Sequence, residues 1–390
     1  MDNLGNRGGI RTHVESNEFE VAGENFQALV ALADRVLNIS TFKRLLSREY
    51  IEDLIFDWSI LRYQDAATAS FPDYLTACVE RDASEHNIWM PIANLQVQED
   101  FQFGPAGIVT IPRSLFDTSE EQWLAMGPEK ASAIRAHADK LRRELQGNAA
   151  VAIAVRGEKI YARSQARSIA EDVVGLLRFF HAAAVTSSIH CPTELLGQEA
   201  DPVVTTLVFD ETGRFDYLKS AAYPHVRTWM LNKAQLSYMR ERGQLELAAS
   251  LVSEVELSDF AKRIRSSILS YSKGLTFPNI SDRLVYSFSA LEALFLKDAS
   301  ETIQQNLAER IAFTISKEPG DRMQIVARVK RIYGARSQYI HHRKDLQVTK
   351  EDLDGFFVHS WAALRTALGN VKRFETHMEY IDAIDQVKYS

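Results

Sequence analysis

The chain has 390 residues and a formal net charge of −7, with 46% hydrophobic and 25% charged residues. This length exceeds what one hydrophobic core usually organises, so we expect two domains, and the composition excludes wholesale disorder. Because the chain is acidic, a surface coated in positive charge is excluded, and any contact with nucleic acid must come from a local basic patch.

The cysteines and the apolar segments limit the class of protein further. Cys78 and Cys191 are the only cysteines, and they lie far apart without metal-ligand spacing, so neither a disulfide framework nor a zinc site is expected. Residues 1–25 contain no apolar stretch of signal-peptide length, and the most apolar segment, 173–185, is shorter than the ~20 residues needed to cross a bilayer. We expect a cytoplasmic protein without membrane association, metal or cofactor.

The amino-terminal half mixes helix and strand patterns. Residues 1–20 lack any periodicity and are predicted to form a flexible tail. Apolar residues at helical spacing predict helices over 26–46, 51–61, 123–145 and 166–184. Runs of β-forming residues between turn signals predict strands over 88–97, 101–111, 149–155, 203–209 and 215–218. The first two strands should pair, and Asp210 and Gly213 predict a hairpin between the last two.

After Tyr223-Pro224 the strand pattern stops, and this shift marks the predicted domain boundary. Five helices are predicted beyond it: 259–275, a helix capped by Ser281 or Asp282 that ends near 295, 303–315, a helix capped by Asp321, and a long final helix from 349 to 371. The predicted class is therefore α+β. Its parts are a tail at 1–20, a mixed α/β domain at 21–225, a helical connector at 226–255 and an all-helical bundle at 256–390.

Basic residues gather near the end of the fourth of these helices. The segment from Arg328 to Lys344 contains no acidic residue, and its basic side chains belong to Arg328, Lys330, Arg331, Arg336, His341, His342, Arg343 and Lys344. By charge alone a solvated helix face is the commoner explanation. The alternative is a local site for an anion.

The order Arg336-Ser-Gln-Tyr-Ile-His341 resembles the signature of the HEPN superfamily, an arginine and a histidine separated by four to six residues, and particularly that of Apea-like HEPN proteins. The preceding segment Ser289-Ala-Leu-Glu-Ala-Leu-Phe295 looks like the acidic second-helix segment of those proteins. The resemblance covers residues 256–378. It implies an all-helical HEPN bundle acting as a metal-independent endoribonuclease, a homodimer, and a role as a toxin or an effector of defence against phages, with the mixed α/β domain in a sensing role.

The resemblance also assigns roles to residues. It implies that Arg336, His341 and Glu292 are catalytic, and that the substrate RNA is bound by Ser337, His342, Arg343, Lys344 and Arg331. Histidine titrates near neutral pH and arginine can hold two phosphate oxygens, which suits attack of a 2′-hydroxyl on its own phosphate. The implied products end in a 2′,3′-cyclic phosphate and a 5′-hydroxyl.

Glu292 also stands out on physical grounds. It lies one helical turn after Phe288 in a largely apolar stripe, where an unpaired charge would be costly. By resemblance its partner would be Arg336; the alternative is an ordinary ion pair at the boundary of the core.

Two points about this motif stay open. Five residues at roughly 100° each place Arg336 and His341 about 140° apart on a regular helix, so that either the arginine side chain swings round or the helix breaks near Gly334. His342 satisfies the family spacing as well.

Some features depart from the family pattern. Active members often carry Asn, Asp or His where Ser337 stands, and a subclass linked to nucleotidyltransferases has a tyrosine where Arg343 stands, so adenylylation chemistry is disfavoured. His359, in the final helix, is expected to be packed or exposed. The alternative function is a non-catalytic HEPN module that binds RNA or nucleotide, or that serves only for dimerisation.

Overall fold

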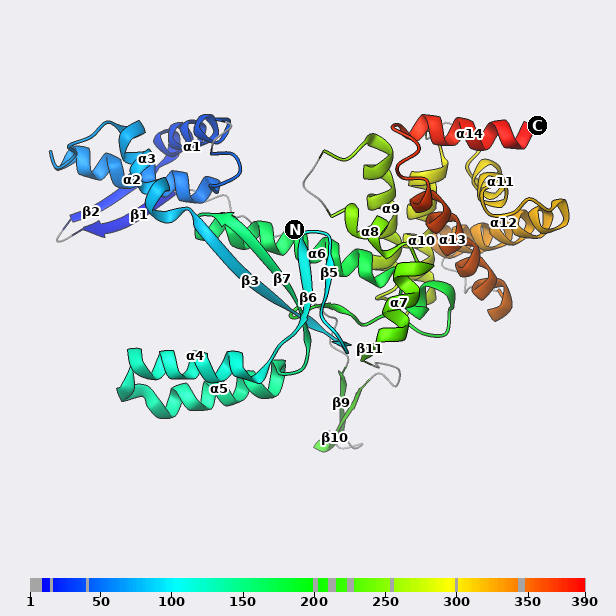
Figure 1. The fold of residues 1–390 in the computed structure, drawn as a ribbon, viewed down its shortest axis with the longest axis horizontal. Helices are drawn as coiled ribbons and strands as arrows, with labels where there is room; N and C mark the ends of the chain where they lie inside the picture. The colour runs from blue at the N-terminus through cyan, green and yellow to red at the C-terminus, as the bar shows by residue number, and fades with distance from the viewer. Residues whose placement is uncertain are drawn as a thin grey trace. The chain divides into compact units, whose positions relative to one another are not determined.

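The computed structural model describes residues 9–14, 17–39, 42–198, 203–209, 215–222, 228–252, 256–298, 301–342 and 348–389 (Figure 1). The chain divides into two compact units. The first comprises residues 1–88 and 153–168, and the second comprises residues 89–152 and 169–390. The boundary predicted near 225 is therefore wrong. The chain passes into the second unit at residue 89, belongs to the first unit again over 153–168, and stays in the second unit from residue 169.

The first unit joins a hairpin to three helices. Strands β1 and β2 pair antiparallel, within the segment predicted to be a flexible tail, so that prediction is wrong for the residues described. Phe19 and Val21 on β2 pack against the helices, while Glu18 and Glu20, which alternate with them, pair with Arg11 on β1. This alternation spans only four residues. The elements are β1 (Gly9–Val14), β2 (Asn17–Ala22), α1 (Gly23–Leu37), α2 (Arg48–Tyr63) and α3 (Phe71–Asp82).

A buried carboxylate from a distant part of the chain completes the first unit. Glu158 is 2% exposed. One of its oxygens accepts a hydrogen bond from the amide of Ser47, the residue that caps α2, and its own amide donates to the carbonyl of Leu45. Its side chain also accepts from the amides of Ile160 and Tyr161 at the start of α6. The segment 153–168 is thus held against residues 1–88 by hydrogen bonds of Glu158 with Ser47 and Leu45.

The strands that follow form a sheet in the order β5-β6-β7-β3-β8, and β11 pairs in parallel with β4. The two strands predicted over 88–97 and 101–111 are in fact four strands, and β11 overturns the expectation that strands end after Pro224. Strands β9 and β10 pair antiparallel as predicted, while the turn residues Asp210 and Gly213 lie outside the described residues. The strands are β3 (Ser84–Ala93), β4 (Leu95–Val97), β5 (Phe101–Phe103), β6 (Ala106–Thr110), β7 (Ala149–Gly157), β8 (Glu194–Leu195), β9 (Val203–Phe209), β10 (Phe215–Ala222) and β11 (Trp229–Leu231).

Three helices accompany these strands. The predicted helix over 123–145 is interrupted at Gly127-Pro128, because proline cannot continue a helix from within, and α4 and α5 lie side by side instead (Figure 1). Helix α6 carries the first part of the apolar segment around 173–185 and ends at Arg178, and a short 3₁₀ helix follows at Ala182–Val185. The bounds are α4 (Arg113–Met126), α5 (Ala131–Leu145) and α6 (Lys159–Arg178).

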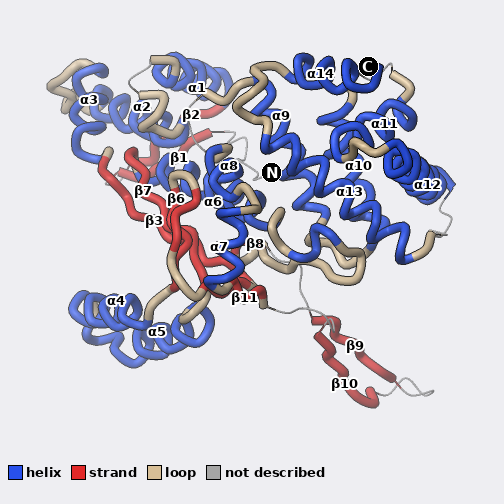
Figure 2. Tube along the Cα trace, turned by 45° about the vertical axis from the view of Figure 1, so that its right-hand side comes forward, coloured by secondary structure: helices blue, strands red, loops and turns tan. Residues whose placement is uncertain are grey.

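From residue 233 the described chain is helical, which confirms the α+β class with its carboxy-terminal helical region (Figure 2). Helices α9 to α13 bury the apolar stripes that the sequence predicts, including Phe260, Leu284, Phe288, Ile311 and Leu364, all 0% exposed. Within the described residues, no helix is long and apolar enough to span a membrane. The helices are α7 (Lys233–Glu241), α8 (Leu245–Ser250), α9 (Asp259–Gly274), α10 (Ile280–Phe295), α11 (Ile303–Ile315), α12 (Pro319–His342), α13 (Lys350–Gly369) and α14 (His377–Tyr389).

Some predicted helix ends in this region are wrong. Helix α10 begins at Ile280 because the Asn279 side chain caps it, rather than Ser281 or Asp282. The helix predicted over 349–371 is confirmed as α13, which ends at Gly369, whereas the following helix α14, from His377, was not predicted.

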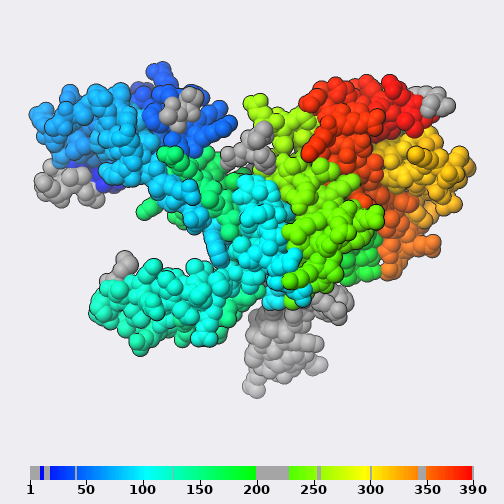
Figure 3. Space-filling view, in the orientation of Figure 1, coloured from blue at the N-terminus to red at the C-terminus, as the bar shows by residue number. Residues whose placement is uncertain are grey.

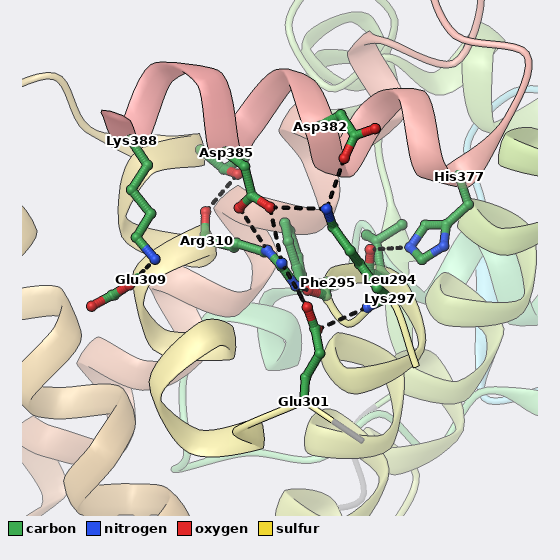
Figure 4. A network of polar contacts seen from close by, with 11 residues as sticks. Leu294, Phe295, Lys297, Glu301, Glu309, Arg310, His377, Asp382, Asp385 and Lys388 are labelled. Atoms are coloured by element: carbon green, nitrogen blue, oxygen red, sulfur yellow. Dashed lines mark hydrogen bonds and ion pairs between the residues drawn. The ribbon is translucent and has the colours of Figure 1, made fainter. Parts of the chain in front are cut away.

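A buried arginine fastens α14 to the bundle (Figure 4). Arg310 on α11 is 4% exposed, and each of its side-chain nitrogens donates a hydrogen bond, at 2.8 to 3.1 Å, to Glu301, Asp385 or the carbonyl of Phe295. Lys297 adds ion pairs to Asp382 and Asp385. Because every charge in this cluster has a partner, we interpret it as a structural clamp.

A second buried arginine joins the bundle to the segment after α6. Arg283 on α10 is 1% exposed, and it donates to the carbonyls of Ala183, Thr186 and Ile189 at 2.7 to 3.0 Å. Its guanidinium also lies 4.5 Å from the centre of the Phe357 ring. Residues outside 256–390 therefore supply part of the core of the bundle.

Candidate functional site

The structure brings Glu292 of α10 and Arg336 of α12 together. Arg336 Nη1 lies 4.0 Å from Glu292 Oε1, and the two side chains are 19% and 26% exposed. One turn earlier on α10, the Phe288 ring meets the Tyr333 ring edge to face at 5.1 Å. These four residues are called the Glu292–Arg336 site below.

Neither charged group in this site is fully hydrogen-bonded. Within the described part of the chain, Arg336 Nε and Glu292 Oε1 are buried atoms that make no hydrogen bond. The guanidinium carbon lies 6.0 Å from the centre of the Phe288 ring and 5.8 Å from that of Tyr333, so two aromatic rings hold the cation in place. Arg336 thus keeps donors for an incoming anion, in contrast to Arg310, whose donors are all used.

Burial and charge act in opposite directions on Glu292. Burial raises the pKa of its carboxyl group, while the positive charge of Arg336 and the nearby Tyr333 side chain lower it. Burial and the Glu292 charge in turn raise the pKa of Tyr333. Tyr333 was not singled out from the sequence as a site residue. Its position three residues before Arg336, and hence on the same helix face, was the available signal.

The two candidate histidines occupy the last two positions of α12. This helix runs without a break through Gly334, so the alternative of a broken helix is wrong. On such a helix the Cα atoms of Arg336 and His341 are separated by about 140° of rotation and about 7.5 Å of rise. The side chains of His341 and His342 lie outside the described atoms.

The remaining predicted RNA-binding residues are dispersed. Arg331 pairs with Asp352 of α13 at 2.6 Å, and Arg328 lies 3.6 Å from the same carboxylate. The hydrogen bond from Arg331 is the main cause that lowers the pKa of Asp352. Ser337 is half-buried. Arg343 and Lys344 lie outside the described residues.

The basic segment is therefore less positive in the fold than in the sequence. Asp352 neutralises part of it from a different helix, and Lys330 donates to Gln305 of α11 instead of facing the Glu292–Arg336 site. Arg336 is the cation of this segment that stands nearest to Glu292 among the described residues.

His359 of α13 is half-buried rather than simply packed or exposed. Its Nδ1 is buried and has no hydrogen-bond partner in the described part of the chain. Burial, with a smaller contribution from the positive charge of Arg328, lowers its pKa to about 4. At neutral pH this ring is uncharged.

The chemistry available at the Glu292–Arg336 site is thus electrostatic. The Arg336 guanidinium, held by two rings and by the half-buried carboxylate of Glu292, can bind one phosphate. A histidine at the end of the same helix can exchange protons. Among the described residues, no group of three or more His, Cys, Asp or Glu side chains is arranged to hold a metal ion. Comparison of the chain with protein-family models, with curated proteins and with solved structures gives no match.

Proposed function

We propose that the helical bundle is a metal-independent endoribonuclease of the HEPN type. The observation that carries this proposal is the contact between Glu292 and Arg336, residues 44 positions apart that are the acidic and basic members of the HEPN-like pattern. A toxin or an effector of phage defence would use such an activity.

Arg336 would bind the phosphate that is cut. Its pairing with Glu292 is long, at 4.0 Å, and the side chain is 19% exposed, so a phosphate oxygen can take a guanidinium donor without first breaking a strong ion pair. Two rings hold the guanidinium in the meantime, which limits the loss of side-chain freedom on binding. Glu292 would keep the guanidinium oriented towards the substrate.

His341 would move the protons in the reaction. The 2′-oxygen forms a bond to the adjacent phosphorus as His341 takes the 2′-proton, and the bond to the 5′-oxygen then breaks as that oxygen receives a proton. Arg336 stabilises the negative charge that gathers on the phosphorane. The RNA is left with a 2′,3′-cyclic phosphate on one fragment and a 5′-hydroxyl on the other.

A cleft shared by two copies of the chain fits the geometry of α12. The unbroken helix points Arg336 and His341 about 140° apart, so one copy's arginine and histidine diverge. A two-fold axis beside the end of α12 would let Arg336 of one copy and His341 of its partner meet on one phosphate. This arrangement is part of the proposal.

Cleavage of RNA in EDTA by matched variants tests the proposal. We expect Arg336→Ala and His341→Ala each to lower the cleavage rate about 100-fold or more, and an equimolar mixture of the two to regain activity. Arg135→Ala serves as the control, because Arg135 also forms a 4.0 Å ion pair, with Glu120. Cleavage that survives Arg336→Ala would contradict the proposal. RNA binding that is indifferent to His341, without cleavage, would favour a non-catalytic module.

A further inference from the structure

A cavity with a volume of about 430 Å³ lies elsewhere in the bundle. Its walls come from the end of α11, the start of α12, the end of α13 and one face of α14. In Figure 3, α14 and the segment before it, in red, lie at the surface next to the yellow residues of α11. Arg322 in this cavity and Arg336 are 14 residues apart on α12, which is about 21 Å along the helix. The cavity is thus separate from the Glu292–Arg336 site.

Helix α14 has different roles on its two sides. Tyr380, Ile384 and Val387 follow one another at helical spacing and line the cavity. Asp382 and Asp385 project from another face into the Arg310 clamp of Figure 4. Because the clamp fixes α14, the wall of the cavity is held in place without using the side chains that line it.

Cations gather at this cavity in an otherwise acidic chain. Lys317, Arg322 and Arg373 line it, and no Asp or Glu is among the described residues of its wall. Arg322 Nε donates to the carbonyl of Ser316 at 2.9 Å, and its guanidinium carbon lies 4.0 Å from the centre of the Phe313 ring. Within the described residues, none of the three cations forms an ion pair with a carboxylate. The cavity is therefore positively charged.

A buried hydroxyl without a partner supplies independent evidence for a ligand. Tyr380 is 3% exposed, and its oxygen makes no hydrogen bond of normal geometry in the described part of the chain. The nearby Thr314 hydroxyl donates its proton to the carbonyl of Arg310 at 2.7 Å, so it does not donate to Tyr380, and it lies outside the geometry of a hydrogen bond from the Tyr380 hydroxyl. A buried hydroxyl without a hydrogen-bond partner costs free energy, so a molecule that accepts a hydrogen bond from it would gain binding free energy.

We propose that this cavity binds a nucleotide. Its cations suit the phosphate, with Arg322 held in place on Phe313 to donate to phosphate oxygens. The aromatic and aliphatic side chains of its wall, among them Phe374 and Val387, suit the base. The volume is far larger than inorganic phosphate needs and falls in the usual range for small-molecule sites. The proposal does not depend on the ribonuclease activity.

Calorimetric titration of the full-length chain tests the proposal. The probes are the four nucleoside monophosphates and the four triphosphates, each alone, together with inorganic phosphate, the four nucleosides and a single-stranded RNA oligomer. We expect at least one nucleotide to bind about tenfold or more tightly than inorganic phosphate and than its nucleoside. Arg322→Gln should weaken that binding about tenfold or more. The control Arg135→Gln should leave it unchanged.

Two milder variants guard against an effect of misfolding. Tyr380→Phe removes a hydroxyl that no described group uses, and Lys317→Gln changes an exposed side chain, so both should fold and both should bind the nucleotide several-fold more weakly. The proposal is overturned if no nucleotide binds at millimolar concentration, if all three variants bind like the wild type, or if only the RNA oligomer binds. His341→Ala should retain nucleotide binding, which separates this test from that of the nuclease.

Discussion

Three arginines of the bundle differ in how completely their donors are used. Arg283 and Arg310 are almost fully buried, and carbonyl or carboxylate oxygens accept from most of their nitrogens. Such groups are expensive to disturb and hold helices together. Arg336 is only partly buried, has a long ion pair and lies against two rings. That difference, rather than the presence of an arginine, singles out Arg336 for binding a phosphate.

His359 gives a prediction of stability against pH. Its pKa is about 4 in the folded chain and about 6.5 unfolded, so the unfolded state takes up a proton first as the pH falls. The stability present above pH 6.5 is lost progressively down to about pH 4, at up to about 1.4 kcal/mol per pH unit. We expect His359→Phe to make the free energy of unfolding, measured in urea, fall less steeply over this window.

The control for this experiment is the exposed His137. The variant His137→Gln should follow the wild-type curve, since it changes a side chain at the surface of the protein. Equal slopes for the wild type and His359→Phe between pH 6.5 and 4 would show that His359 is not buried in its neutral form. Comparing slopes also removes the common contribution of the carboxyl groups.

At the scale of helices and strands, the sequence predicts what local patterns determine. The apolar stripes of α9 to α13 repeat over three turns or more, so their existence and their buried faces follow from the sequence. Strand β11 has only three residues, too few for a pattern, and it forms because it pairs with β4, more than 130 residues earlier. A strand that depends on a partner so distant in the sequence cannot be predicted from the residues next to it.

The same limit applies to the candidate site. Glu292 could be identified as an acid in an apolar stripe, and its need for a cation followed from electrostatics. That Asp352 neutralises Arg331 could not be predicted, because the contact depends on how α12 packs against α13. The cavity around Tyr380 could not be predicted either, since four separate elements contribute to its wall.

At the scale of the whole molecule, the bundle is not an independent domain of residues 256–390. Arg283 and Tyr271 inside that range donate to the carbonyls of residues 183 to 189, and the Trp361 indole donates to the carbonyl of Phe179. Removing residues 1–255 would leave these buried donors unpaired. A composition shift near residue 224 marks the change to helix but not the limit of the compact unit.

We therefore expect the fragment 256–390 to be less stable than the fragment 169–390 by about 3 kcal/mol or more, since it loses the acceptors of a buried cation. Urea unfolding followed by circular dichroism at 222 nm measures the difference. Equal free energies of unfolding for the two fragments would mean that the segment after α6 contributes nothing to the core of the bundle.

The chemistry of the RNA ends tests the central claim most directly. The wild-type protein and Arg336→Ala are incubated with RNA in EDTA, and the fragments are analysed by mass spectrometry. The mechanism at Arg336 and His341 predicts 2′,3′-cyclic phosphate and 5′-hydroxyl ends from the wild type and almost no fragments from the variant. Fragments with 3′-hydroxyl and 5′-phosphate ends, or cyclic ends formed equally well without the Arg336 guanidinium, would contradict it.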